Sequence, residues 1–289
     1  MIKIDGSQGE GGGQILRTSV SLAAALGESI TIDNIRSNRP KPGLRPQHLH
    51  SIQTIAELSN STTEGLDLNS TKVSLHPNNI SSKNIDINIG TAGSITLLVQ
   101  SLLQSISISG KTFMFTITGG TDVNWSPSTD YFCRIVIPMI EKFGFSITSS
   151  VIKRGFYPKG SGKIIFTVKS PTTIKPISII EPKYSNLVID GIITSGSSIS
   201  KPQSKIDEQC LYAKTFLEQH QLNIDSINTS THDSGSFSSG ICISSTSQNC
   251  FIGSDILETN VKQLNSLGKN CSKKFLSEYA SNCTVDHQL

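Results

Sequence analysis

The sequence lacks the patterns that identify several common classes of protein. No apolar run in its 289 residues approaches the roughly 18 of a membrane-spanning helix, and the first residues contain no signal-peptide core. The net charge of +3 is too small to indicate nucleic-acid binding from global electrostatics. Six cysteines form no Cys-x-x-Cys pair and no metal-ligand spacing with the six histidines. We therefore expect a soluble cytoplasmic protein with free thiols and no membrane contact.

Standard nucleotide-binding motifs are absent as well. A dinucleotide fingerprint requires a glycine where Gln14 stands. Gly155–Gly160 has the glycine spacing of a P-loop, but Ser161 follows where that motif requires lysine. Any phosphate site must therefore have another design.

The segment from Asp5 to Arg17 contains five glycines, two carboxylates and one arginine. Its glycines allow positive φ angles and close approach of a ligand to the backbone. A helix expected from Ile15 to Leu26 would direct its free N–H groups at this loop, which suits a phosphate. Glu10 beside an anion site would need a metal ion or a cation such as Arg17. A glycine-rich helix entry without a ligand is the alternative.

A second segment, from Asn34 to His48, carries Arg36, Arg39, Lys41 and Arg45 but no acidic residue. Its three prolines predict a stiff, extended loop that holds the arginines for anion binding. A helix is expected from about Gln47 to Ser59, with His48 in its first turn. That histidine is either a surface residue at a helix start or a donor to the same phosphate.

Strands followed by small-residue turns and helices recur along the chain, which favours an α+β or α/β architecture of repeated units. A separate small domain is expected at about 181–271, inserted between a first part (1–180) and a return (272–289). Gln100, on a helix that follows Gly90–Ser94, either contacts a ligand or faces solvent. The expected strands include 2–4, 29–35, 65–75 (a pair), 85–89, 112–118, 146–153, 162–168, 175–181, 186–194 and 240–244. Further helices are expected at 130–143, 202–219 and 259–281.

Five segments together resemble the RNA 3'-terminal phosphate cyclase family. The match runs in order from Ile2 to about Gly162, weakens beyond Ser170 and returns faintly at Thr284–Asp286. The segments are Asp5–Arg17, Asn34–His48, Gly90–Gln100, Gly119–Asp122 and Arg154–Gly160.

The resemblance implies repeated units of a four-stranded sheet and two helices, like the C-terminal domain of a translation initiation factor, with a small inserted α/β domain. It also implies a ligase that uses ATP with Mg²⁺ or Mn²⁺. A histidine would accept AMP from ATP, and AMP would pass to an RNA 3'-phosphate. The neighbouring 2'-hydroxyl would then displace AMP and close a 2',3'-cyclic phosphate. Adenylation makes sense because it gives a phosphate monoester a good leaving group.

Carried over by position, the resemblance places Glu10 at the metal and phosphate site. The residues expected to handle phosphates are Arg17, Arg36, Arg39, Gln47 and His48. Gln100, Gln288 and Leu289 match positions that contact the nucleotide. The nucleophilic histidine of the family matches no residue here, since His287 is out of place, and we expect the chain to be C-terminally incomplete. A non-catalytic RNA-binding or ribosome-biogenesis factor is the alternative hypothesis.

Overall fold

The computed structural model describes residues 1–9, 11–196, 199–248 and 250–286, and within it the chain forms two compact units. The first unit comprises Met1–Gly119, Gly144–Lys153 and Lys163–Lys175. The second comprises Gly120–Phe143, Arg154–Gly162 and the residues from Pro176 onward. Each unit therefore combines segments that are far apart in the sequence.

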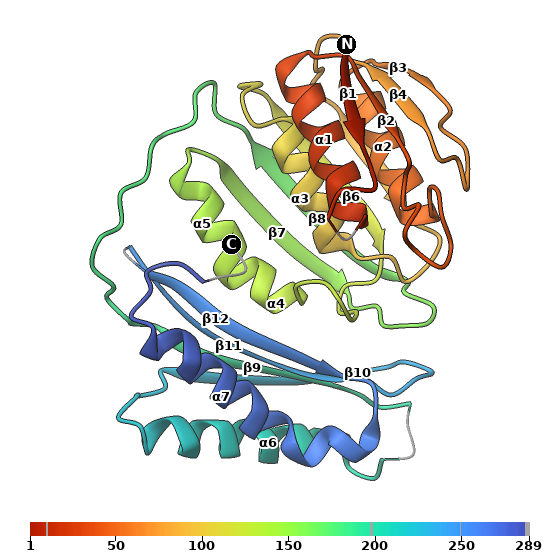
Figure 1. The fold of residues 1–289 in the computed structure, drawn as a ribbon. Helices are drawn as coiled ribbons and strands as arrows, with labels where there is room; N and C mark the ends of the chain where they lie inside the picture. The colour runs from red at the N-terminus through yellow and green to blue at the C-terminus, as the bar shows by residue number, and fades with distance from the viewer. Residues whose placement is uncertain (10, 197–198, 249, 287–289) are drawn as a thin grey trace. The chain divides into compact units, whose positions relative to one another are not determined.

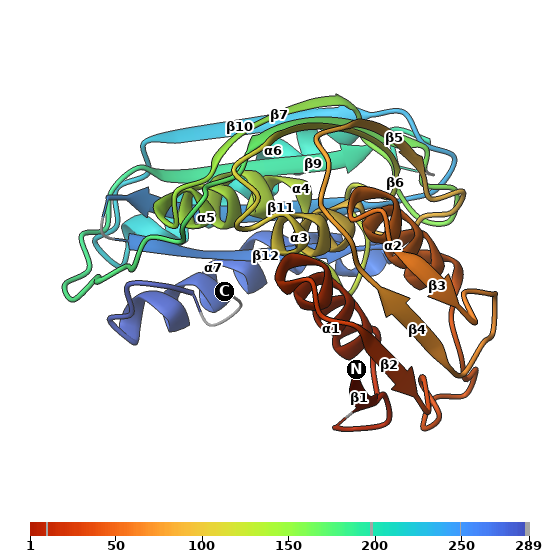
Figure 2. The same cartoon turned by 90° about the horizontal axis from the view of Figure 1, so that it is seen from above.

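The first unit begins with a sheet in the order β1-β2-β4-β3, with α1 (Gly13–Leu26) and α2 (Pro46–Leu58) on one face (Figures 1 and 2). Its strands are β1 (Ile2–Asp5), β2 (Ile30–Asp33), β3 (Thr62–Glu64) and β4 (Val73–His76). β1 and β2 are parallel, with Asp5 opposite Asp33. Since parallel strands end at the same edge of a sheet, the loops that follow β1 and β2 are neighbours.

The helix α1 forms because its apolar side chains recur at helical spacing. Its buried apolar residues are Leu16, Val20, Ala23 and Ala24. Their spacing of three or four residues places them on one face of the helix. The helix ends at Gly27, whose φ of 71° is the left-handed conformation of a helix C-cap. Burial of this face fixes the axis of α1 and therefore the direction of its N-terminus.

A second sheet of the first unit repeats the same pattern in the order β5-β6-β8-β7. Its elements are β5 (Asn84–Asn88), α3 (Ile95–Ser105), β6 (Thr112–Gly119), β7 (Ser146–Lys153) and β8 (Gly162–Lys169). Alternate residues of β6 are buried, and the rings of Phe113 and Phe115 stack at 5.9 Å between centroids. α3 packs against α1 and α2. The two sheets share one strand order, as the expected repeat of four-stranded units requires.

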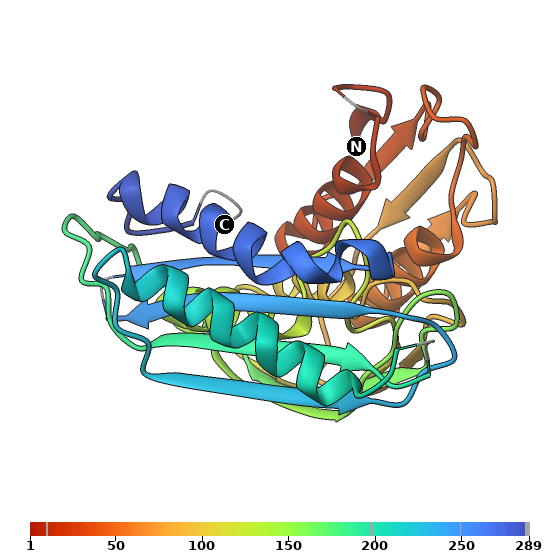
Figure 3. The ribbon, with the colours of Figure 1, turned by 90° about the horizontal axis from the view of Figure 1, so that it is seen from below.

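The second unit contains a sheet in the order β10-β9-β11-β12, with α6 and α7 side by side on one face (Figure 3). Its elements are β9 (Leu187–Thr194), α6 (Pro202–Glu218), β10 (Ser226–His232), β11 (Ser239–Ser247), β12 (Cys250–Glu258), a 3₁₀ turn (Val261–Ser266) and α7 (Leu267–Ala280). Ile189, Ile206, Cys210 and Phe275 belong to its core. The protein is thus a mixed α+β protein with several four-stranded sheets.

A helical segment that contains a proline also belongs to the second unit. It runs from α4 (Thr129–Tyr131) through a π-helical turn (Phe132–Val136) into α5 (Ile137–Lys142). Pro138 cannot donate the hydrogen bond of an ordinary helix, and the π-helical turn directly before it accommodates the change without ending the helix. The expected helix at 130–143 is therefore present with this irregularity, and its first turns pack against β11 and β12.

Several expected elements differ in the structure. Residues 175–181 form no strand, and Ile180 is 86% exposed, so the apolar run has no sheet to pair with. β10 and β12 were not expected. β10 is rich in Ser, Thr and Asn, and the apolar pattern of β12 is short, so both resemble loops. The pair expected across 65–75 is formed instead by β3 and β4, with residues 65–72 as the connection.

The two compact units do not follow the expected boundaries at 180 and 271, and whether 181–271 is an inserted domain stays a prediction. Among the helices of the described residues, none combines the length and apolar character needed to cross a bilayer.

Candidate functional site

The glycine loop, residues 6–13, connects β1 to α1 and brings backbone into close contact with side chains. Gly9 and Gly11 have φ angles of 59° and 55°, which the loop needs for its turns. A β-carbon on Gly13 would overlap His48 Nε2 and lie 3.1 Å from Arg17 Nη1. One on Gly12 would lie 3.5 Å from Arg39 Nη2. The start of α1 is therefore surrounded by a histidine and two arginines.

The arginine loop, residues 34–45, connects β2 to α2 and is fixed by backbone hydrogen bonds. Gly43 N donates to Ile35 O at 2.8 Å, and Leu44 N donates to Ser70 O at 2.9 Å. Ile35 and Leu44 are fully buried and anchor both ends of the loop. Gly43 has a φ of 78° and leaves no room for a side chain beside the carbonyl of Asn69. The backbone at both ends of the arginine loop is therefore fixed within the first unit.

Two side-chain contacts join the loops. Asp5 Oδ1 accepts hydrogen bonds from Ser7 N at 3.0 Å, Ser7 Oγ at 2.7 Å and Asn34 Nδ2 at 3.2 Å. The bonds from the Ser7 hydroxyl, the Ser7 amide and Asn34 lower the pKa of Asp5, so it is ionised at neutral pH. Asn38 Nδ2 donates to Ser7 O at 3.2 Å. We call this set the Asp5 bracket.

His48 is buried at the start of α2, with 7% of its surface exposed. This excludes the alternative of a surface residue. Its Nδ1 accepts a hydrogen bond from the backbone N–H of Arg45 at 3.2 Å. An acceptor nitrogen carries no proton, so the neutral ring has its proton on Nε2, the atom that faces Gly13.

Burial and the nearby positive charges of Arg36, Arg17 and Arg45 lower the pKa of His48 from 6.5 to about 4. The ring is therefore a neutral hydrogen-bond donor at pH 7. Such a donor can contact an anion without adding a further positive charge to the cluster.

The described arginines lie close enough together to repel one another. Among the described residues, neither Arg17 nor Arg36 has a carboxylate partner, and Arg36 Nε and Gln47 Nε2 are buried without an acceptor. Burial lowers the pKa of Arg17, and burial with repulsion from Arg39 and Arg45 lowers that of Arg36. Buried donors without acceptors are rare and call for an explanation. An anion at the start of α1 would satisfy them.

The structure thus brings together Arg17, Arg36, Arg39 and His48 around the glycine loop. Gln47 lies beside them and also faces Gly93, whose β-carbon would be 3.6 Å from that of Gln47. Gln100 lies on α3, half-buried, and nothing places it in the cluster.

The other predicted site residues cannot be placed. Glu10, Gln288 and Leu289 lie outside the described residues, as does His287, which was not expected to be the nucleophile. In the part of the chain that is described, no group of three His, Cys, Asp or Glu side chains could hold a metal ion. The expected metal site at Glu10 therefore stays a prediction.

Sequence reasoning missed Asp5 as a link between the two loops and Arg45 as the backbone partner of His48. Arg45 was visible as part of the basic run, but its N–H contact depends on the start of α2. The partner of Asp5 lies 29 positions away, and no local pattern points to it.

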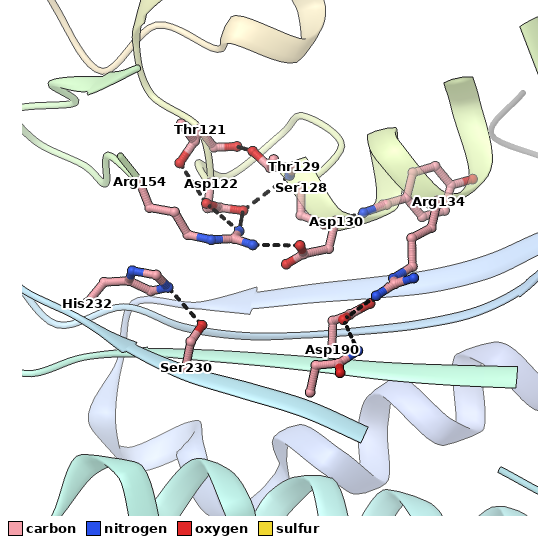
Figure 4. A network of polar contacts seen from close by, with 12 residues as sticks. Thr121, Asp122, Ser128, Thr129, Asp130, Arg134, Arg154, Asp190, Ser230 and His232 are labelled. Atoms are coloured by element: carbon pink, nitrogen blue, oxygen red, sulfur yellow. Dashed lines mark hydrogen bonds and ion pairs between the residues drawn. The ribbon is translucent and has the colours of Figure 1, made fainter. Parts of the chain in front are cut away.

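A second polar network lies wholly in the second unit (Figure 4). Arg154 pairs with Asp122 at 3.0 Å and also with Asp130, and Arg134 pairs with Asp190. Burial opposes the charged form of Arg154, but the two carboxylates outweigh burial and raise its pKa. Each of these two arginines has at least one carboxylate partner.

Comparison with known proteins agrees with the family resemblance of the five sequence segments. The family described as RNA 3'-terminal phosphate cyclase matches residues 8–287. A protein of that name from Pyrococcus abyssi is 38% identical over 290 residues, covering 100% of this chain and 83% of the relative. A protein of the same name from Pyrococcus furiosus is 37% identical, and the match covers 100% of this chain and 83% of the relative. Another from Archaeoglobus fulgidus is 36% identical, and the match covers 100% of this chain and 84% of the relative.

Proposed function

The chain belongs to the RNA 3'-terminal phosphate cyclase family, and we propose that it converts an RNA 3'-terminal phosphate to a 2',3'-cyclic phosphate at the expense of ATP. One observation carries the proposal. Among the described residues of the arginine loop and the start of α2, Arg36 Nε and Gln47 Nε2 are buried donors without acceptors, which a terminal phosphate would satisfy. A scaffold protein would have no physical need for such a cluster.

The RNA 3'-phosphate would lie against the start of α1, where three kinds of donor converge. The first N–H groups of α1 have no side-chain cap, because its N-cap residue is Gly12. Arg36 and Arg39 supply fixed positive charge, and guanidinium groups suit the geometry of phosphate oxygens. His48 donates from Nε2 and stays neutral, so it helps to orient the phosphate.

The donor set fits a phosphate group and, by the same chemistry, the phosphates of ATP. When bound, ATP supplies AMP as a leaving group for the RNA phosphate. For a divalent metal, Glu10 is the only predicted ligand and lies outside the described residues. We therefore assign to this chain the binding and orientation of phosphates and derive no step through the metal.

Ring closure is the step that the described residues serve most directly. The 2'-oxygen forms a bond to the adenylated phosphorus, the bond from that phosphorus to the AMP oxygen breaks, and the hydroxyl proton passes to solvent. Negative charge on the phosphate oxygens and the departing AMP is stabilised by groups that are already in place. The preorganised arginine loop provides such groups because both of its ends are anchored.

An RNA whose 3'-phosphate is already joined to AMP tests this step without ATP. The residue that would accept AMP from ATP is not assigned in this chain, so an adenylated RNA isolates ring closure. We expect release of AMP and formation of a 2',3'-cyclic end. Arg36→Ala should slow the reaction about ten- to hundredfold, as expected for loss of charge-assisted hydrogen bonds.

Lys41→Ala is the matched control, because Lys41 is an exposed cation of the same loop. If both variants lose the same fraction of the ring-closure rate, the effect of Arg36→Ala is only a loss of overall positive charge. That result would refute a specific site at Arg36. Binding of the RNA without AMP release by the wild type would favour the non-catalytic RNA-binding factor.

A further inference from the structure

The only tryptophan of the chain, Trp125, is displayed in a way that the fold does not require. Its surface is 99% exposed, and its φ is 67°, a conformation that is uncommon for any residue other than glycine. A large aromatic ring gains nothing for stability in this position, because it leaves all of its apolar surface in water. Its presence calls for a partner that is absent when the chain is alone.

The loop that carries Trp125 is held firmly. Thr129 N donates to Asp122 Oδ1 at 3.1 Å, and Thr129 Oγ1 donates to Thr121 O at 2.8 Å. These bonds close the loop at its base, and Ser126 Oγ donates to Val123 O at 2.8 Å within it. Trp125 is thus presented by an ordered loop.

The Arg154 network joins this loop to a neighbouring turn of the same unit (Figure 4). Arg154 contacts Asp122 and Asp130, and Asp122 forms a β-bridge with Phe156. Gly160 N donates to Phe156 O at 2.7 Å, which closes the turn. The turn presents Tyr157, which is 66% exposed, together with exposed Lys159. The buried charged side chains of this network therefore fix two loops that display aromatic rings and a cation. The proposed phosphate site does not account for this arrangement.

We propose that Trp125, with Tyr157 and Lys159 in support, binds single-stranded RNA by stacking an unpaired base on the indole ring. The proposal rests on the proposed function, which makes RNA the substrate, and adds a contact to a nucleotide other than the terminal phosphate. Aromatic rings stack on any base, and lysine attracts the phosphate backbone, which is the usual design for binding single strands without sequence preference. An ordered loop keeps the entropy cost of such a contact small.

Because the sequence has one tryptophan, indole fluorescence reports on this residue alone. The chain is titrated with a single-stranded oligoribonucleotide that ends in a 3'-phosphate, while the anisotropy of a label on its 5' end reports binding independently. We expect strong quenching with the oligonucleotide. Inorganic phosphate, which has no base to stack, and an abasic oligomer of equal length should leave the indole emission unchanged.

Trp125→Ala should weaken the affinity for the oligonucleotide on the order of tenfold, and Trp125→Phe should restore most of it, since a smaller ring still stacks. Affinity for inorganic phosphate should not change in either variant. Tyr212→Ala is the matched control, because Tyr212 is an exposed aromatic residue of α6 in the same unit. Since Trp125 is exposed, its replacement should not alter thermal stability.

Each outcome decides between the two proposals. Binding by anisotropy without quenching, or unchanged affinity of Trp125→Ala, would overturn the stacking site and leave the phosphate site intact. Quenching by ATP alone would show that the ring takes the base of the nucleotide, which also overturns the assignment to RNA. Absence of any binding of the oligonucleotide would count against the proposed function itself, and the stacking proposal would fail with it.

Discussion

His48 should titrate far below an ordinary histidine and should carry its proton on Nε2. The hydrogen bond from Arg45 N fixes Nδ1 as the acceptor, and burial with three nearby arginines lowers the pKa from 6.5 to about 4. Substitution by asparagine, which cannot titrate, removes this effect. His50→Asn, two positions along the same helix, is the matched control.

The lowered pKa implies a defined dependence of stability on pH. The folded state prefers the neutral ring, so the contribution of His48 is fully present above pH 6.5 and is lost as the pH falls toward about 4. At about 1.4 kcal/mol for each tenfold change in proton affinity, the total is about 3 kcal/mol, of which about 2 kcal/mol is lost by pH 5. His48→Asn should remove this part of the pH dependence, whereas His50→Asn should leave it.

Histidine-selective ¹⁵N NMR measures the pKa and the tautomer directly and does not depend on two-state unfolding. We expect a neutral Nε2–H signal for His48 down to about pH 5. A nucleoside 3'-phosphate should raise the pKa of His48, because a bound anion offsets the arginines. Titration near 6.5, or a proton on Nδ1, would refute the reasoning from burial and charge.

Two further predictions concern the framework of the site. Gly13→Ala should abolish phosphate binding, because its β-carbon would overlap His48 Nε2. Gly12→Ala should bind normally, because the nearest atom to its β-carbon is 3.5 Å away. Calorimetry with a nucleoside 3'-phosphate compares the two variants, and equal binding would contradict the packing described for Gly13. Asp5→Ala should weaken the same binding severalfold by releasing both loops, while Asp5→Asn, which keeps an acceptor oxygen, should retain it; equal losses would contradict the Asp5 bracket.

The sequence was sufficient to predict the strands and helices that have clear periodicity and strong end signals. The helix ending at Gly27 and the alternating strand at 112–118 are examples. β10 was missed because its polar residues pair with β9, a buried strand whose paired residues lie 38 positions earlier in the sequence. The apolar run at 175–181 was misassigned for the opposite reason, since no partner strand lies beside it. Tertiary pairing decided both cases.

For the candidate site, composition predicted the participants, and the topology explains their meeting. A basic, proline-rich segment and a glycine-rich helix entry are visible locally. Their proximity follows from two parallel strands, β1 and β2, which no local pattern specifies. The state of His48 could not be predicted, because its tautomer depends on one backbone N–H and its pKa depends on burial and on arginines from the arginine loop and α1.

The two charge networks also differ in what they contribute. In the second unit, attraction to Asp122 and Asp130 outweighs burial and raises the pKa of Arg154, while burial raises the pKa of Asp130. In the first unit, Arg39 and Arg45 repel Arg36, and that repulsion opposes folding unless it is offset, as the proposed phosphate would do. A neutral His48 limits this repulsion, because a protonated ring would add a further positive charge to the cluster. Its low pKa therefore favours keeping several arginines together at the proposed phosphate site.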